Sequence, residues 1–419
     1  PKKFIDYEAL EKSKEELKAA KQYAATKSKV KRDKAEVQRE KQDYKKFLAV
    51  SNMKIVFYSE KNGFYKYYRN IIEEIIRRTN IVIHYITSDP NDEVFGMESE
   101  QFKPYYIGEN RLIVLMMKLE SDVVVMTTPD LENFHLKRSY VKQDALYIYV
   151  PHDVNSSNLT FRKDALDHYD VIFTSGYKNK AELAEREEKF GVPKKQLVEW
   201  GSGVIDNMIV SYNEMIQDET ENDKKTVLIA PSWQKDNIMD SYIADMLEQL
   251  KNSPYRIIVR PHPQYVRHYG ARIEALEEKY ASDNITFEKD FSSNKTVYTA
   301  DLLITDWSSI AFEYAFTTKK PVIFIDTPMK IMNPEYEKLG IEPFNIWTRN
   351  KIGQVIEQDK INTLKETVDE MLKNSSKYNE KISKMTEEYV YNIGNSAEIG
   401  AKYIVQAIQE KIKKKKEGN

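Results

Sequence analysis

Two histidines follow apolar, strand-like runs and stand directly after prolines. His152 comes after LYIYVP and precedes Asp153, and His262 comes after YRIIVRP and precedes Pro263. Proline lacks a backbone N–H and disfavours helix for the residue before it, so both imidazoles should leave their strands in extended backbone. A histidine exchanges a proton near neutral pH, and an adjacent carboxylate orients it. We expect His152 to act as a base and His262 to stabilise a leaving group; the alternative for both is packing.

A second polar group stands where a strand turns into a helix, in TDWSSIAFEYA (305–315). Helix N-termini expose free N–H groups and the positive end of the helix dipole, and serine hydroxyls add donors. Ser308 and Ser309, together with Asp306 before them, therefore predict a phosphate-binding donor site, while the alternative is ordinary helix capping by Asp306 or Ser308. Glu313, one turn into the helix, would repel a phosphate but can accept hydrogen bonds from a hydroxylated ligand.

Three residues at neighbouring strand ends suit the same anion. Arg260 precedes the Pro-His-Pro segment, and a guanidinium binds phosphate through two parallel hydrogen bonds. Ser232 and Trp233 end the run TVLIAPSW, where an indole can stack on a base, although its alternative is a place in the core. Because Arg260 converges with Ser308 and Ser309, phosphate binding is the favoured interpretation.

The composition excludes several classes of protein. The chain has 419 residues, which favours two domains with an appendage. With 64 basic and 66 acidic residues the formal charge is -2, so nucleic acid is not an expected partner. The absence of cysteine excludes disulfides and thiolate metal sites, and no HExxH, Walker A or GxGxxG motif is present. No run is long and apolar enough to span a bilayer, so we expect a cytoplasmic location, in solution or at the membrane surface.

Short apolar runs alternate with helical stretches through both halves of the chain. Nearly continuous apolar runs are typical of parallel strands that are buried on both faces. The pattern predicts an α/β fold of two doubly wound, Rossmann-like domains facing a cleft in a glycosyltransferase-B-like arrangement, with ligands at the carboxyl ends of the strands. The expected strands are 53–59, 81–87, 122–128, 146–152 and 171–176, then 226–233, 255–263, 285–290, 301–309 and 321–327.

Helical segments flank these two halves. Residues 6–47 lack glycine and proline and are rich in good helix formers, but their apolar stripe is thin. They are either a solvated helix or hairpin, or an arm for docking, oligomerisation or anionic lipid. At the other end, an amphipathic helix is expected after Ser396. The expected parts are a helical extension (1–50), a first domain (51–205), a second domain (224–390) that follows the polar interval QDETENDKK, and a C-terminal amphipathic helix with a basic tail (395–419).

Five motifs occur in an order and spacing that resemble one known family. They are PHD (151–153), APSW (230–233), RPHP (260–263), TDWSSIAFEYA (305–315) and KPVIFID (320–326). Over roughly residues 53–390 the chain resembles the CDP-glycerol glycerophosphotransferases, the teichoic acid primase and polymerase family of Gram-positive cell envelopes. It departs from that family's pattern in having Pro-His-Asp-Val where Trp-His-Gly-Thr is common, and Trp307 where tyrosine is usual.

This resemblance implies an enzyme that transfers glycerol phosphate from CDP-glycerol to an acceptor hydroxyl and releases CMP. It implies that the first domain takes a lipid-linked saccharide or polyol-phosphate acceptor and that the second takes the donor. His152 matches the family's base, with Asp153 on the acceptor side, and His262 and the two serines match residues at the donor phosphates. No tightly bound cofactor is expected, while Mg²⁺ carried by the donor phosphates stays open. The inner face of the cell membrane is an expected partner of the basic tail (411–416).

Several alternatives stay open at this point. In the first alternative, the enzyme uses CDP-ribitol as its donor. In the second, it is a glycosyltransferase of the same fold that uses a nucleotide sugar. In a third, the protein is a scaffold whose function resides in the helical extension. Within the family we expect a primase or short-chain transferase, since no large extra domain precedes residue 51.

Overall fold

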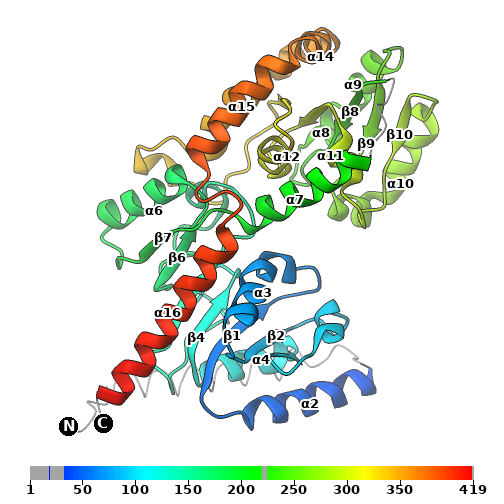
Figure 1. The fold of residues 1–419 in the computed structure, drawn as a ribbon. Coiled ribbons are helices and arrows are strands. Elements are labelled where there is room, and N and C mark those ends of the chain that lie inside the picture. The colour runs from blue at the N-terminus through cyan, green and yellow to red at the C-terminus, as the bar shows by residue number, and fades with distance from the viewer. Residues whose placement is uncertain (1–17, 19–32, 219–223, 418–419) are drawn as a thin grey trace.

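The computed structural model describes residues 33–218 and 224–417, together with Lys18. It contains two sheets, one in each half of the chain (Figure 1), and their strands pair in parallel. The strand order is β3-β2-β1-β4-β5-β6-β7 in the first sheet and β10-β9-β8-β11-β12-β13 in the second. The predicted α/β architecture with two doubly wound domains is confirmed.

The strands are short and most of their residues are buried, because helices cover both faces of each sheet. The strands of the first sheet are β1 (Met53–Ser59), β2 (Ile83–Thr87), β3 (Phe102–Tyr106), β4 (Ser121–Met126), β5 (Leu146–Tyr149), β6 (Val171–Thr174) and β7 (Gln196–Glu199). Those of the second are β8 (Thr226–Ile229), β9 (Arg256–Val259), β10 (Ile285–Phe287), β11 (Leu302–Thr305), β12 (Val322–Ile325) and β13 (Gly353–Ile356).

In both sheets the strand order reverses beside the first strand of the domain. β1 lies between β2 and β4, and β8 lies between β9 and β11. The connections on either side of such a switch point diverge, which leaves room for a ligand outside the carboxyl ends of the strands. The switch points thus mark where each domain can bind a ligand.

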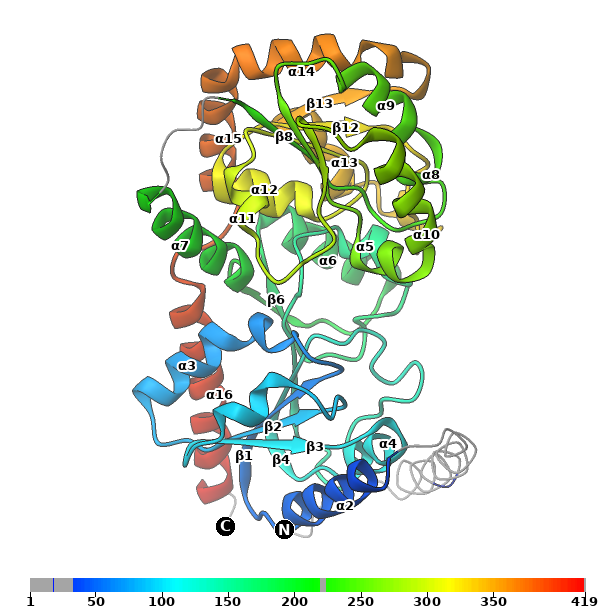
Figure 2. The same ribbon diagram turned by 90° about the vertical axis from the view of Figure 1, so that its right-hand side faces the viewer.

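Each sheet is sandwiched between helices (Figure 2). Around the first sheet these are α3 (Arg69–Arg78), α4 (Glu109–Met117), α5 (Ser157–Thr160) and α6 (Tyr177–Phe190), with the short turns η1 (Tyr65–Tyr67) and η2 (Glu93–Met97). The second domain has α7 (Gly203–Asp218), α8 (Ile238–Ser241), α9 (Ile243–Leu250), α10 (Pro263–Tyr280), α11 (Lys295–Thr299), α12 (Ile310–Thr318), α13 (Phe344–Ile352), α14 (Leu364–Lys373) and α15 (Ser375–Tyr389), with η3 (Tyr336–Leu339) and η4 (Gln358–Thr363).

The last helix, α16 (Ser396–Glu417), returns from the second domain to pack along the first (Figures 1 and 2). Its Gly400 approaches α3 so closely that a Cβ there would lie 2.9 Å from a side-chain carbon of Ile71. Trp200 is buried beneath the start of the helix and donates its indole N–H to the carbonyl oxygen of Ser396, 2.8 Å away. Among the helices that the structure describes, none is both long and apolar enough to cross a membrane.

The described part of the N-terminal extension is α2 (Lys34–Leu48), and it is docked rather than solvated. Its Asp43 accepts a hydrogen bond from the backbone N–H of Tyr106 at 3.0 Å, and Phe47 is 1% exposed against the rings of His84 and Tyr105. The interpretation of a solvated helix is therefore wrong for residues 34–48, because one face of α2 covers the edge strand β3. The predictions for residues 1–17 and 19–32 lie outside the described residues, as does most of the polar interval between the domains.

Candidate active site

The predicted site residues of both domains come from the carboxyl ends of strands. His152 follows β5, and Glu313 lies one turn into α12, which follows β11. Burial raises the pKa of the Glu313 carboxyl. The charge of Asp153 raises this pKa as well, whereas the charges of Lys66 and His152 lower it. All three of these groups belong to the first domain. The two domains thus bring His152, Asp153 and Glu313 into one electrostatic environment.

His152 is held by two neighbours at its own sheet edge. Its Nδ1 lies 3.2 Å from the hydroxyl oxygen of Thr127, which follows β4, and its Nε2 lies 3.8 Å from a carboxylate oxygen of Asp153. The ring of Tyr67 meets the imidazole edge-on, with 5.8 Å between ring centroids. If Nδ1–H donates to Thr127, Nε2 carries the lone pair that can take a proton, beside a carboxylate that stabilises the resulting cation.

His262 is the N-cap of α10 in the second domain. Its Nδ1 accepts a hydrogen bond from the backbone N–H of Gln264 at 3.1 Å, so in the neutral ring Nε2 carries the proton. Burial, together with the positive charges of Lys330 and Lys61, lowers the pKa of His262 to about 4. The ring also stacks on Trp233, at 6.1 Å between centroids. His262 is therefore a neutral N–H donor at neutral pH.

The N-terminus of α12 lacks a side-chain cap. Ser309 is its N-cap residue, and the Ser309 side chain makes no capping hydrogen bond to the helix. The hydroxyl of Ser309 bonds to Glu313, and Ser308 is partly exposed beside it. The backbone N–H groups of Ala311 and Phe312 donate to the carbonyl oxygens of Ser308 and Ser309 at 3.3 and 3.0 Å. The phosphate site at this helix start stays a prediction.

Asp306 does not face a ligand directly. One carboxylate oxygen accepts the backbone N–H groups of Ser232 and Trp307, both at 2.8 Å, and the other accepts that of Ile238 at 3.2 Å. Burial raises the pKa of this carboxyl, while those same hydrogen bonds oppose the shift. Ser232 is 6% exposed, whereas Trp233 beside it is 49% exposed. Asp306 therefore positions the loop that presents Trp233.

Arg260 is buried and its guanidinium is engaged within its own domain. One terminal nitrogen pairs with the carboxylate of Glu288 at 2.7 Å, and both terminal nitrogens donate to the carbonyl oxygen of Ser293 at 3.1 Å. The predicted convergence of Arg260 with Ser308 and Ser309 on one phosphate is not seen. A buried charge pairs with the nearest good partner, and here that partner is a carboxylate 28 residues along the chain.

Several charged and aromatic residues near the site were missed in the sequence. Lys61, Lys66 and Tyr67 follow β1, and Lys330 follows β12. The sequence feature that could have identified them is their place directly after a strand, because such residues lie at the ligand-binding edge of a parallel sheet. Among the described residues, no three His, Cys, Asp or Glu side chains group closely enough to hold a metal ion.

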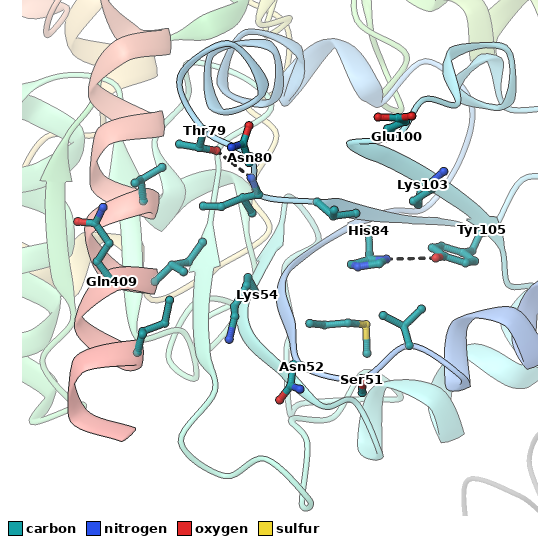
Figure 3. Close-up of a pocket in the computed structure, with 17 residues that line it drawn as sticks. Ser51, Asn52, Lys54, Thr79, Asn80, His84, Glu100, Lys103, Tyr105 and Gln409 are labelled. Carbon is teal, nitrogen blue, oxygen red and sulfur yellow. Dashed lines mark hydrogen bonds between the residues drawn. The ribbon is translucent and has the colours of Figure 1, made fainter. Parts of the chain in front are cut away.

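Figure 3 shows a separate cavity of about 820 Å³ at the opposite, amino-terminal edge of the first sheet. His84 lies in it beside Tyr105, with 3.1 Å between the imidazole Nδ1 and the hydroxyl oxygen (Figure 3). Burial lowers the pKa of His84 to about 4. None of the predicted site residues lines this cavity, so it lies apart from the candidate active site.

Comparison with known proteins finds one family whose model matches most of the chain. The family model described as CDP-Glycerol:Poly(glycerophosphate) glycerophosphotransferase matches residues 43–408. The teichoic acid glycerol-phosphate primase of Bacillus subtilis (strain 168) is 27% identical over 168 residues, which are 39% of this chain and 41% of that protein. This chain therefore matches less than half the length of that relative.

Two solved structures share the fold. The wall teichoic acid polymerase TagF, in a crystal soaked with CDPG, superposes with a TM-score of 0.57 at 15% identity, over 98% of this chain and 100% of that one. A UDP-N-acetylglucosamine 2-epimerase from Rickettsia bellii gives a TM-score of 0.54 at 14% identity, over 86% and 97%. The likeness supports the glycosyltransferase-B-like arrangement that the sequence predicts.

Proposed function

Because the chain belongs to the CDP-glycerol:poly(glycerophosphate) glycerophosphotransferase family, we propose that it transfers glycerol phosphate from CDP-glycerol to a hydroxyl of a lipid-linked cell-envelope acceptor, releasing CMP. The observation that supports the proposal is that the charges of His152 and Asp153 in the first domain act on the buried carboxyl of Glu313 in the second. A transfer between two substrates needs them held side by side, and the carboxyl edges of two domains provide a place for each.

In this mechanism His152 is the general base. Its Nε2 takes the proton of the acceptor hydroxyl, whose oxygen attacks the β-phosphorus of CDP-glycerol. A new O–P bond forms as the bond between the β-phosphorus and the bridging oxygen breaks, and CMP leaves with that oxygen. Asp153, 3.8 Å from Nε2, and Glu313 stabilise the imidazolium. Positioning and charge neutralisation supply most of the catalysis in such a transfer.

Residues of both domains stabilise the leaving CMP phosphate, and most of them belong to the second. The neutral His262 donates its Nε2–H, while the hydroxyl of Ser308 and the backbone N–H of Ser309 at the start of α12 offer further donors. Lys61 and Lys330, whose charges reach His262, neutralise the developing negative charge. Trp233 is exposed beside His262 and offers a surface on which the cytosine can stack.

We also propose that the protein binds peripherally to an anionic membrane through the end of α16. Lys413, Lys414 and Lys416 are exposed there, and each basic residue near such a surface contributes about 1 kcal/mol. Cosedimentation with phosphatidylglycerol vesicles should fall when these three lysines are changed to glutamine, and phosphatidylcholine vesicles serve as the control. Equal sedimentation of both proteins would refute this attachment.

The experiment that tests the transfer reaction measures CMP release from CDP-glycerol, with and without a lipid-linked disaccharide analogue, for wild type and His262→Ala. Release that the acceptor stimulates, and that the variant loses, supports the proposal. Consumption of CDP-ribitol or a UDP-sugar instead would keep the fold and replace the donor. Inactivity with all donors would favour a scaffold. Repeating the assay in EDTA decides whether Mg²⁺ enters with the donor phosphates.

A further inference from the structure

The segment that follows His152 is fixed in place by the second domain. Val154, two residues after the histidine, is 1% exposed and lies in the same apolar cluster as Phe344 of the second domain. The backbone N–H of Ser156 donates to the side-chain oxygen of Asn345, at the start of α13, at 2.7 Å. The loop that carries the proposed base is therefore anchored in the opposite domain.

A chain of side-chain amides continues from Asn345 to Asp153. The Nδ2 group of Asn345, a residue that is 4% exposed, donates to Oδ1 of Asn155 at 2.8 Å. The Nδ2 group of Asn155 in turn donates to Oδ2 of Asp153. That same carboxylate oxygen lies 3.8 Å from Nε2 of His152. A residue of the second domain is thus linked to the proposed base through Asn155 and the Asp153 carboxylate.

Both amides in this chain can take only one orientation. The backbone N–H of Ser156 can only donate, and the carboxylate of Asp153 can only accept. Oδ1 of Asn345 therefore faces Ser156, and its Nδ2 faces Asn155. The Nδ2 of Asn155 is left to donate to Asp153. Because each amide accepts on one side and donates on the other, a change at Asn345 removes the group that orients Asn155.

The helix that carries Asn345 is also held at the donor side of the second domain. Arg349, one turn further along α13, pairs with Asp326 at 2.7 Å, and its guanidinium carbon lies 4.0 Å from the ring centroid of Trp307. Trp307 directly precedes Ser308, a residue of the predicted phosphate site. One helix therefore contacts the loop on the donor side and the loop that carries the base.

We propose that Asn345 and Asn155 are positioning residues, which hold Asp153 against His152 from across the domain boundary. The inference rests on the proposed function and deepens it, because it names what aligns the base. Oδ2 of Asp153 is kept on the Nε2 side of the ring, where the imidazolium forms as the acceptor hydroxyl loses its proton. Without the amide chain the carboxylate can turn away, and the charge of the imidazolium is less well compensated.

The test measures kcat and KM for Asn345→Ala, Asn155→Ala and the double variant in the full chain, with CDP-glycerol and a lipid-linked disaccharide analogue. Each single change should lower kcat about tenfold, the effect of one charge-assisted hydrogen bond, with the KM for CDP-glycerol within about twofold of wild type. Because Asn345 acts through Asn155, the double variant should also lose about tenfold. A kcat for Asn345→Ala within about twofold of wild type, or a loss of about a hundredfold in the double variant, would overturn the inference.

Asn333→Ala is the matched control. Asn333 is also a buried asparagine of the second domain, and its Nδ2 donates across the domain boundary to Oδ1 of Asn158 at 3.0 Å. Asn158 donates to the carbonyl oxygen of Tyr336 rather than to Asp153, so kcat should stay within about twofold of wild type. If this variant lost as much kcat as Asn345→Ala, loosening of the domain interface would explain both losses, and the inference would fail.

An NMR measurement separates this inference from the proposed function. If no donor and acceptor pair gives CMP release, the proposed function fails, whereas the alignment of His152 can still be observed. Its imidazole NMR signals, identified by their absence in His152→Ala, should shift in Asn345→Ala and stay in place in Asn333→Ala. Signals that do not move in Asn345→Ala would overturn the inference, whether or not the enzyme is active.

Discussion

Glu182, on α6 of the first domain, accepts a hydrogen bond from the backbone N–H of Phe344 in the second domain, at 3.0 Å. The hydroxyl of Ser156 donates to the other carboxylate oxygen at 2.6 Å, and the backbone N–H of Ser156 donates to the side-chain oxygen of Asn345 at 2.7 Å. These bonds join the start of α13 to the segment that follows His152. The relative placement of the two domains and the position of the base are therefore coupled.

Glu182 should make stability depend on pH. Burial raises the pKa of its carboxyl from 4.5 to about 7, although the hydrogen bonds from Ser156 and Phe344 oppose the shift. Between pH 4.5 and 7 the folded protein holds a proton that the unfolded chain has lost, so the stability present at low pH is lost as pH rises through this window.

Glu182→Gln removes that contribution, while the amide oxygen can still accept from the backbone N–H of Phe344 and the amide NH2 can donate to the hydroxyl oxygen of Ser156. Compared with wild type, the variant should gain about 2 kcal/mol of unfolding free energy on going from pH 5 to pH 8. Urea unfolding at several pH values measures this difference, with Glu188→Gln as the control on the same helix. Parallel pH profiles for wild type and Glu182→Gln would contradict the assignment.

Replacing the proposed base should affect turnover more than donor binding. His152→Ala should lower kcat by about 10²- to 10⁴-fold, the usual contribution of a general base, with little change in the KM for CDP-glycerol. Thr127→Val removes the hydroxyl that orients Nδ1 and should give a smaller loss of kcat with a changed pH profile. A higher KM for CDP-glycerol with an unchanged kcat would place His152 in the donor site instead.

His262 should stay neutral through the pH range of the assay. Because burial and the charges of Lys330 and Lys61 lower its pKa to about 4, its imidazole NMR signals should not shift between pH 6 and 8. His262→Ala should raise the KM for CDP-glycerol, while His262→Gln should recover part of the affinity by restoring an N–H donor. An imidazole that titrates near pH 6.5 in the protein without donor would refute the burial argument.

Arg260 should matter for stability more than for donor binding. Removing one partner of a buried ion pair leaves the other uncompensated, so Arg260→Met should cost about 3 kcal/mol of unfolding free energy. Arg260→Met combined with Glu288→Leu should recover much of that loss, because no unpaired charge remains. Under conditions in which Arg260→Met is folded, its KM for CDP-glycerol should change less than that of His262→Ala. A larger change in Arg260→Met would return the guanidinium to the phosphate site.

The sequence by itself determined the fold class and most of the strands. Continuous apolar runs such as 53–59 cannot be solvated, and they reappear as buried strands with almost the same bounds. Three strands were missed: β3 (Phe102–Tyr106), which contains Pro104, β7 (Gln196–Glu199) and β13 (Gly353–Ile356). All three are edge strands that pair on one side only, where proline and polar residues are tolerated and the local pattern is weak.

The candidate site also combines features that the local sequence predicts with features that only the tertiary structure decides. The positions of His152 and His262 at strand ends follow from prolines and apolar runs within a few residues, which is local information. The engagement of Arg260 with Glu288, the action of Lys61 on His262, and the shared environment of His152 and Glu313 join residues far apart in the chain. Only tertiary structure decides such contacts, because electrostatic and hydrogen-bond partners are chosen by distance in space after the two domains have packed together.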